Sequence, residues 1–172
     1  ATGAIEHAST LYRLGRFDEA RKAALRIRGL QVADSRILAV TALKLGQILL
    51  HDQKYVEATV ELKTSVQHDP ADLEALQSLA GALRRTGQDE EARSILKMYR
   101  EIRSATTSLE THQAIYRARP EHRAAQENII RALITLSRFE EAEKQLELRQ
   151  RKFPRDPRQD ELLRLLTESK SK

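Results

Sequence analysis

The sequence has no cysteine and no tryptophan, only four prolines and six glycines, and 4% aromatic residues in 172. Without cysteine the chain can form no disulfide and no thiolate metal site, and it lacks a cysteine nucleophile. Prolines and glycines interrupt helices, and aromatic residues favour strands, so a sequence poor in all of these is predicted to be helical. The absence of cysteine leaves the redox compartment open, and the localisation is unknown.

Long hydrophobic runs and an N-terminal signal are missing as well. No run approaches the roughly 18 apolar residues of a membrane helix, so we expect no membrane insertion. The chain begins ATGAIEH, without methionine, which we interpret as the start of a trimmed or mature fragment. With 40% hydrophobic and 32% charged residues and a net charge of +5, it is predicted to fold as one domain or two small ones.

One short turn occurs four times in the chain: GRFDEA at 15–20, QKYVEA at 53–58, GQDEEA at 87–92 and SRFEEA at 137–142. Ala58 and Ala92 are 34 residues apart, as are Pro120 and Pro154. That spacing is the period of a helix–turn–helix repeat. Each turn is therefore predicted to join two antiparallel helices, and the hairpins must stack to bury their apolar faces.

Small residues and prolines fit this arrangement. Antiparallel helices approach closely only where side chains are small, so we expect helix contacts at Gly46, Ala80, Ala20, Ala58, Ala92 and Ala142. Acidic residues before the alanines fall in the first turn of a helix, where the helix dipole favours them. The prolines at 70, 120 and 154 are placed where a helix must stop.

The segment LGQILLHDQKYVEATVELKTSVQHDP, at 45–70, resembles a tetratricopeptide repeat, and the resemblance extends over most of the chain. It implies an all-α, right-handed superhelix of stacked antiparallel helix pairs, with about ten helices. The chain departs from the family pattern at Ile27, Tyr99 and Arg149, where a small residue is usual, and at Ile130 and Asp89.

The phase of the repeat breaks near residue 105, because the segment 104–122 supplies one helix where a repeat would supply two. We predict three hairpins in 1–106, an extra helix in 107–122, a fourth hairpin in 123–156 and a capping helix in 157–172. The alternative is one long helix over 89–119. We favour a break at Thr106–Ser108, because these residue types are poor helix formers.

The family resemblance implies a concave groove, lined by the first helix of each hairpin, that binds a protein or peptide. The aligned residues most suited to contact a partner are Tyr12, Arg13, Lys44, Gln47, His51, Arg84, Arg85, Asn128 and Arg131. Further aligned groove residues are Ile5, Ser9, Leu43, Leu50, Glu74, Gln77, Ser78 and Ile134. The basic residues among them predict a partner with acidic character.

The clamp by which chaperone-binding members of the family grip a carboxylate needs two asparagines. The chain has a single asparagine, Asn128, so we exclude that function. Alternative hypotheses are a regulatory or substrate-presenting module of a larger enzyme and self-association through the ends of the stack. Nucleic-acid binding is a weaker hypothesis, because no nucleic-acid module and few aromatic residues are present.

Catalytic motifs are missing, so we expect no enzyme, no cofactor and no metal. The five histidines have no recognised ligand spacing. His112 and Tyr116, one helical turn apart, could line a small site, although two exposed polar residues are the simpler interpretation. The basic cluster Arg149, Arg151, Lys152, Arg155 and Arg158 is interpreted as a solvated helix end, with a contact to phosphate or an acidic partner as the alternative.

Overall fold

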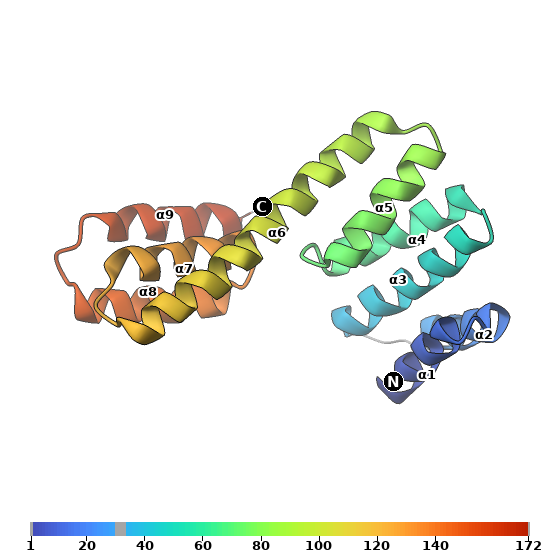
Figure 1. Ribbon diagram of the computed structural model, residues 1–172, viewed down its shortest axis with the longest axis horizontal. Helices are drawn as coiled ribbons and strands as arrows, with labels where there is room; N and C mark the ends of the chain where they lie inside the picture. The colour runs from blue at the N-terminus through green and yellow to red at the C-terminus, as the bar shows by residue number, and fades with distance from the viewer. Residues whose placement is uncertain (1, 30–33, 172) are drawn as a thin grey trace. The chain divides into compact units, whose positions relative to one another are not determined.

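A computed structural model describes residues 2–29 and 34–171, and in these ranges the chain forms nine α-helices and no strand (Figure 1). The helices are α1 (Thr2–Arg13), α2 (Phe17–Gly29), α3 (Ser35–His51), α4 (Tyr55–His68), α5 (Leu73–Arg85), α6 (Asp89–Ala118), α7 (Arg123–Thr135), α8 (Phe139–Lys152) and α9 (Arg158–Lys170). The predicted all-α class is confirmed. None of these described helices is both long and apolar enough to cross a membrane.

The chain divides into two compact units, Ala1–Tyr99 and Arg100–Lys172, and α6 contributes to both. In the first unit α1 packs against α2, α3 against α4, and α4 against α5. In the second unit α9 packs against both members of the pair α7 and α8. The predicted boundaries at 106, 122 and 156 stay predictions.

Four three-residue turns close the hairpins, and they share one backbone conformation. Their middle residues, Gly15, Gln53, Gly87 and Ser137, have φ of 73°, 60°, 73° and 56°. The amide of the next residue donates to a carbonyl five positions back in each turn, for example from Arg16 to Leu11 and from Arg138 to Leu133, both at 2.9 Å. This is the Schellman ending of a helix. The repeated sequence therefore encodes a repeated helix ending.

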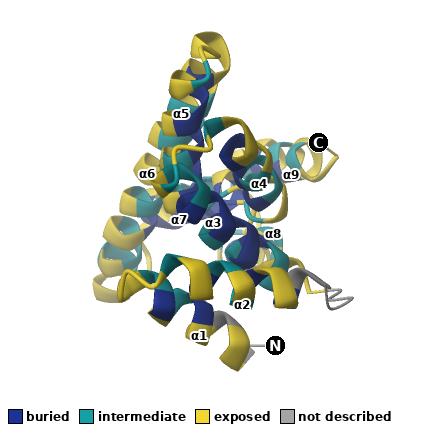
Figure 2. Ribbon diagram, turned by 90° about the vertical axis from the view of Figure 1, so that its right-hand side faces the viewer, coloured by how far each residue is buried: buried dark blue, intermediate teal, exposed yellow. Residues whose placement is uncertain are grey.

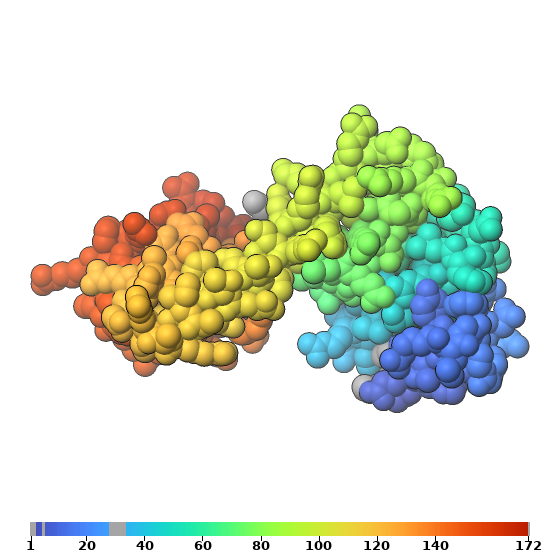
Figure 3. All heavy atoms as spheres, viewed as in Figure 1, coloured from blue at the N-terminus to red at the C-terminus, as the bar shows by residue number. Residues whose placement is uncertain are grey.

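The alanine after each turn lies at a helix contact, as predicted. Ala20, Ala58, Ala92 and Ala142 are exposed by no more than 1%. Gly46 lies so close to Leu62 that an added Cβ would stand 2.5 Å from its Cγ. Figure 2 shows the buried residues of α3 and α5 on the inner sides of these helices, and Figure 3 shows the side chains of α3, α4 and α5 filling the space between them.

The favoured break at Thr106–Ser108 is wrong, because α6 runs without interruption through it. Within the helix the hydroxyl of Thr106 donates to the carbonyl of Ile102, and that of Thr107 donates to Arg103. Ile102, Ala105 and Leu109 are buried along one side of the helix. Burial of this apolar stripe outweighs the weak helix propensity of the polar residues. The continuous helix also accounts for nine helices in the described residues where about ten were expected.

Helix ends elsewhere follow the predicted signals. α4, α6 and α8 each end two residues before a proline. Asp34 and Asp72 accept backbone amides at the starts of α3 and α5. At the start of α7 the same role falls to His122, whose Nδ1 accepts the amide of Ala125 at 3.0 Å.

Candidate functional site

In the first unit, side chains from the three helices α1, α3 and α5 meet on one face. Tyr12 is in the last turn of α1, Lys44 and Gln47 lie one turn apart on α3, and Glu74 is in the first turn of α5. Gln47 Nε2 donates to Glu74 Oε1 at 2.6 Å, and Lys44 Nζ donates to the same oxygen at 3.5 Å and to Gln47 Oε1 at 3.0 Å. The Lys44 ammonium also lies 5.8 Å from the centre of the Tyr12 ring. We call these four residues the Glu74 cluster.

The charges in the Glu74 cluster compensate one another. Glu74 is exposed whereas Gln47 is buried, so the carboxylate lies at the solvent side of the cluster. Burial, and then the negative charge of Glu74, raises the pKa of the Tyr12 hydroxyl. An incoming carboxylate would have to compete with Glu74 for Lys44 and Gln47.

Aromatic stacking fixes the neighbouring end of this face. The ring of Phe17 stacks on the imidazole of His51 with centres 3.8 Å apart, and Tyr12 meets Phe17 edge-on at 5.4 Å. His51 Nδ1 lies 3.4 Å from a carboxylate oxygen of Asp52, which also pairs with Arg21. His51 is thus exposed but oriented by a ring below it and a carboxylate beside it.

The remaining predicted cations of the first unit lie in the last turns of α1 and α5. Arg13 donates to the hydroxyl of Thr10 at 3.5 Å, and Arg84 and Arg85 are both exposed. The guanidinium of Arg85 lies 5.6 Å from the centre of the Tyr55 ring. Cations are favoured at these helix ends by the dipole, and their heads stay in solvent. We call Arg13, Arg84 and Arg85 the basic rim.

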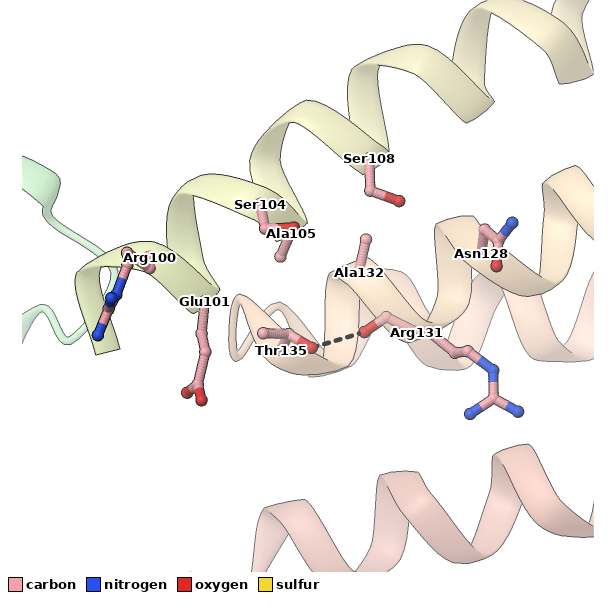
Figure 4. Close-up of a pocket in the computed structure, with 9 residues that line it drawn as sticks. All are labelled: Arg100, Glu101, Ser104, Ala105, Ser108, Asn128, Arg131, Ala132 and Thr135. Atoms are coloured by element: carbon pink, nitrogen blue, oxygen red, sulfur yellow. Dashed lines mark hydrogen bonds between the residues drawn. The ribbon is translucent and has the colours of Figure 1, made fainter. Parts of the chain in front are cut away.

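The other two predicted site residues, Asn128 and Arg131, lie in the second unit on α7. They line a pocket of about 450 Å³ between α7 and residues 100–108 of α6 (Figure 4). Its walls are small or polar, and they consist of Arg100, Glu101, Ser104, Ala105, Ser108, Asn128, Arg131, Ala132 and Thr135. The two serines had no predicted role, because the favoured interpretation interrupted the helix at Thr106–Ser108.

Arg131 is held by carboxylates of its own unit. It donates to Glu127 at 3.1 Å and to Glu161 of α9 at 2.8 Å, and Arg158 donates to the second oxygen of Glu127 at 2.6 Å. Burial opposes ionisation of Glu127, but the hydrogen bonds from Arg158 and Arg131 outweigh it and lower the pKa of this carboxyl. Arg131 therefore links α7 to α9 and contributes little uncompensated charge to the pocket.

The basic cluster near the end of α8 is not simply solvated. Arg149 is only 1% exposed, and it donates to the carbonyl of Arg123 at 2.7 Å and to Asp156 at 2.5 Å. Lys152 donates to the carbonyl of Pro120. The hydroxyl of Ser65 in α4 makes the equivalent contact in the earlier hairpin, because it donates to the carbonyl of Ala39 in α3, also 26 residues back. Arg149 therefore occupies a position between paired helices that a small hydroxyl residue occupies in the earlier hairpin.

Three histidines have structural partners. His68 Nδ1 lies 2.8 Å from the hydroxyl of Ser35, and His122 caps α7. His112 contacts Asn128 at 2.9 Å. Tyr116, which was predicted to line a small site with His112, instead contacts Lys152, whose Nζ lies 5.7 Å from the centre of the Tyr116 ring. No group of three metal-ligating side chains occurs in the described part of the chain.

Antiparallel helix pairs closed by one repeated turn define a helical repeat protein. Residues 49–107, about a third of the chain, match the family model of the tetratricopeptide repeat. The predicted resemblance is thereby confirmed for this segment. No curated protein matches the chain.

Two solved structures illustrate what the chain is similar to. One is Naa15/Naa10 bound to HypK-THB, with 18% identity and a TM-score of 0.41 over 91% of this chain but only 26% of that chain. The other is described as a candidate protein-binding protein from Bacteroides ovatus, with 14% identity and a TM-score of 0.41 over 98% of both chains.

Proposed function

We propose that the chain is a non-catalytic scaffold that binds a peptide or partner protein on the face of its first unit that α1, α3 and α5 form. The observation that carries this proposal is the convergence of Tyr12, Lys44 and Gln47 with Glu74 from three different helices. The family match supports it, because tetratricopeptide repeats are typically non-catalytic binding modules. The predicted residues Asn128 and Arg131 belong to the second unit and are not part of this proposed face.

The basic rim supports the acidic character proposed for the partner. The positive charge of Lys44 is compensated by Glu74. The positive charge offered to a partner therefore comes mainly from Arg84 and Arg85 in the last turn of α5. Exposed cations mainly steer association and select the sign of the partner's charge. The Glu74 cluster, at the other end of α5, offers hydrogen-bond groups and the aromatic face of Tyr12.

The test compares two charge-matched double variants of the full chain. Arg84→Gln with Arg85→Gln removes the two cations of the basic rim that lie on α5, and Lys22→Gln with Arg26→Gln removes two exposed cations from α2. Proteins captured from a lysate are quantified by mass spectrometry, and the affinity of each captured partner is then measured by titration calorimetry. We expect the rim variant to weaken binding about tenfold, equal to about 1.4 kcal/mol.

The matched variant on α2 is expected to bind like the unaltered protein. Equal retention of every partner by both variants would contradict the proposed face. Circular dichroism of both variants checks that the helices are intact.

A further inference from the structure

We propose that one end of the second unit binds phosphate groups on a phosphorylated segment of the partner protein. We call this surface the basic end. It consists of exposed cations in the last turns of α6 and α8 and in the segments that follow these helices: Arg117, Arg119, Arg123, Arg151, Lys152 and Arg155. The inference rests on the proposed function for the existence of a protein partner, but it assigns a different surface and a different chemistry.

Contacts between the end of α8 and the segment after α6 bring these cations together. Lys152 Nζ donates to the carbonyl of Pro120, and the buried Arg149 donates to the carbonyl of Arg123 at 2.7 Å. The charged groups of Arg123, Lys152 and Arg149 lie 4.4, 5.7 and 6.0 Å from the centre of the Phe153 ring. Three cationic groups are therefore held around one half-buried ring.

The acidic residues nearby do not neutralise this surface. The segments 117–123 and 149–157 contain seven arginines and lysines but only two acidic residues, Glu121 and Asp156, so their net charge of +5 equals that of the whole chain. The side chain of Asp156 is only 6% exposed and pairs with Arg149, and its charge also acts on Arg123. The main counter-charge is therefore buried, and the exposed cations face solvent.

Other arginines of the second unit have carboxylate partners. Arg131 pairs with Glu161, and Arg138 pairs with Glu141. Within the part of the chain that the structure describes, no carboxylate pairs with the arginines at 119, 151 and 155. Like charges gathered without partners repel one another, and a bound anion would relieve that cost.

The repeat itself does not require a basic end. The helix α4 is also the second helix of a hairpin, but His68 is the only basic residue in its last turn, and Asp69 and Asp72 follow it. In α8 the last turn carries Arg149, Arg151 and Lys152. A helix dipole acts equally on both helices, so it does not account for the difference.

The kind of cation favours phosphate as the ligand. Five of the six cations of the basic end are arginines, whose planar groups donate two parallel hydrogen bonds to phosphate or carboxylate. A phosphorylated side chain carries about two negative charges and three acceptor oxygens, so more than one guanidinium can bind it at once. Cations crowded around one ring suit such a compact anion better than a single carboxylate.

The surroundings favour a peptide over a nucleic acid or a membrane. The aromatic rings here, Tyr116 and Phe153, are half-buried and already contacted by Lys152 and Arg123, so they offer little surface for base stacking. Among the described residues 117–123 and 150–157, no large hydrophobic side chain is exposed that could insert into a bilayer.

The probe is a degenerate library of short peptides with a fixed central phosphoserine, together with matched libraries that carry serine or glutamate at that position. Peptides retained by the full chain are remade with each of the three residues and titrated by calorimetry. We expect the phosphorylated form to bind about tenfold more tightly than either other form, because it adds charge-assisted hydrogen bonds.

Two variants of the full chain lose the same charge. The first alters the basic end: Arg119→Gln, Arg151→Gln and Arg155→Gln. The control alters exposed cations elsewhere in the second unit: Arg103→Gln, Lys144→Gln and Arg164→Gln. We expect the first variant to bind the phosphopeptides about tenfold more weakly and the control to bind them like the unaltered protein. Circular dichroism checks that both variants keep their helices.

Three results would overturn the proposal. One is equal binding of the phosphoserine and glutamate forms, and another is an equal loss of affinity in both variants. The third is tighter binding of a single-stranded oligonucleotide, or of vesicles that contain anionic phospholipids, than of any phosphopeptide at the same ionic strength.

Failure of this proposal is distinguishable from failure of the proposed function. The Arg84→Gln, Arg85→Gln variant retains the basic end, so it should bind the phosphopeptides with unchanged affinity, and a loss there would contradict a site confined to the second unit. If that variant retained every lysate partner while the variant of the basic end lost one, the proposed face would fail and the basic end would stand.

Discussion

At the scale of single residues, the four turns show how one backbone conformation tolerates different side chains. Gly15 and Gly87 occupy the left-handed position in two turns, and Gln53 and Ser137 occupy it in the others. The left-handed region costs L-residues roughly 1–2 kcal/mol, which glycine avoids. The hydrogen bonds of the turn are made in all four cases, so the non-glycine residues are held there at a cost in stability.

Replacing Ser137 by glycine should therefore stabilise the protein. Ser137 is exposed, so the substitution removes the strain of its φ of 56° without removing a buried contact. We expect the free energy of unfolding to rise by about 0.5–1 kcal/mol, because the greater freedom of glycine in the unfolded chain offsets part of the gain. Urea denaturation measures the change.

The reverse substitution is the control. Gly87→Ala places a Cβ in open space, so only its φ of 73° can cause a change. A loss of about 1 kcal/mol is expected. If both substitutions shifted stability in the same direction, backbone strain would not be the cause.

At the scale of elements, the pair α3 and α4 is set by one close approach. Gly46 faces Leu62, which is completely buried and belongs to the apolar cluster of α3, α4 and α5. The side chain of Leu62 cannot move away from Gly46, because protein interiors are close-packed and buried neighbours surround it. The separation of these two helices thus depends on the missing Cβ at Gly46.

Gly46→Ala is expected to destabilise the first unit. Overpacking against Leu62 costs about 1–3 kcal/mol, and the better helix propensity of alanine returns up to about 1 kcal/mol, so a net loss of about 1–2 kcal/mol remains. Gly81→Ala on α5 is the matched control, since its added Cβ has no neighbour within 4 Å. This control should gain about 0.5–1 kcal/mol. Thermal and urea unfolding of both variants would show the opposite signs, and a gain in both would refute the close contact.

At the scale of the whole molecule, the two units are stabilised in different ways. The first unit is built around Leu62, Leu79 and Leu83 with alanines between its helices. In the second unit, Arg149 and Asp156 form a buried ion pair in addition to the apolar contacts. Removing one partner of such a pair is costly, because a buried charge is left alone.

The pair makes the second unit sensitive to acid. The backbone amide of Arg158 and then the charge of Arg149 lower the pKa of Asp156 against the effect of its burial. A lowered pKa means that the ionised carboxyl stabilises the fold above the unfolded value of about 3.9 and that this contribution is lost as pH falls through the folded value. Stability should therefore decline from about pH 5 downward.

Asp156→Asn should reduce the free energy of unfolding by about 3 kcal/mol near neutral pH, because Arg149 loses its counter-charge. The difference from the unaltered protein should shrink as the pH falls below about 4, toward the lowered pKa at which the folded Asp156 carboxyl becomes protonated. Urea titrations at a series of pH values measure both effects. Glu168→Gln, which opens an exposed pair with Arg164, is the control and should have little effect at any pH. A difference that stayed constant with pH would contradict the assignment to Asp156.

Much of the architecture followed from local sequence. The repeated turns, the alanines after them and the prolines two residues beyond helix ends were predicted from spacing, because these features depend on a few adjacent residues. The candidate site followed less completely. Tyr12, Lys44 and Gln47 do converge, whereas Arg131 and Arg149 have intramolecular partners that lie 26–30 residues away in the chain.

By itself, the sequence determined the helical class and the hairpin as the unit of folding, since period, turn chemistry and breakers are all local. Only the tertiary structure decided that α6 runs through Thr106 and Thr107, because burial of Ile102, Ala105 and Leu109 outweighs local propensity. It also decided which charges are compensated. Glu74 reaches Lys44 and Asp156 holds Arg149 because folding places their side chains together, and no spacing in the sequence encodes those contacts.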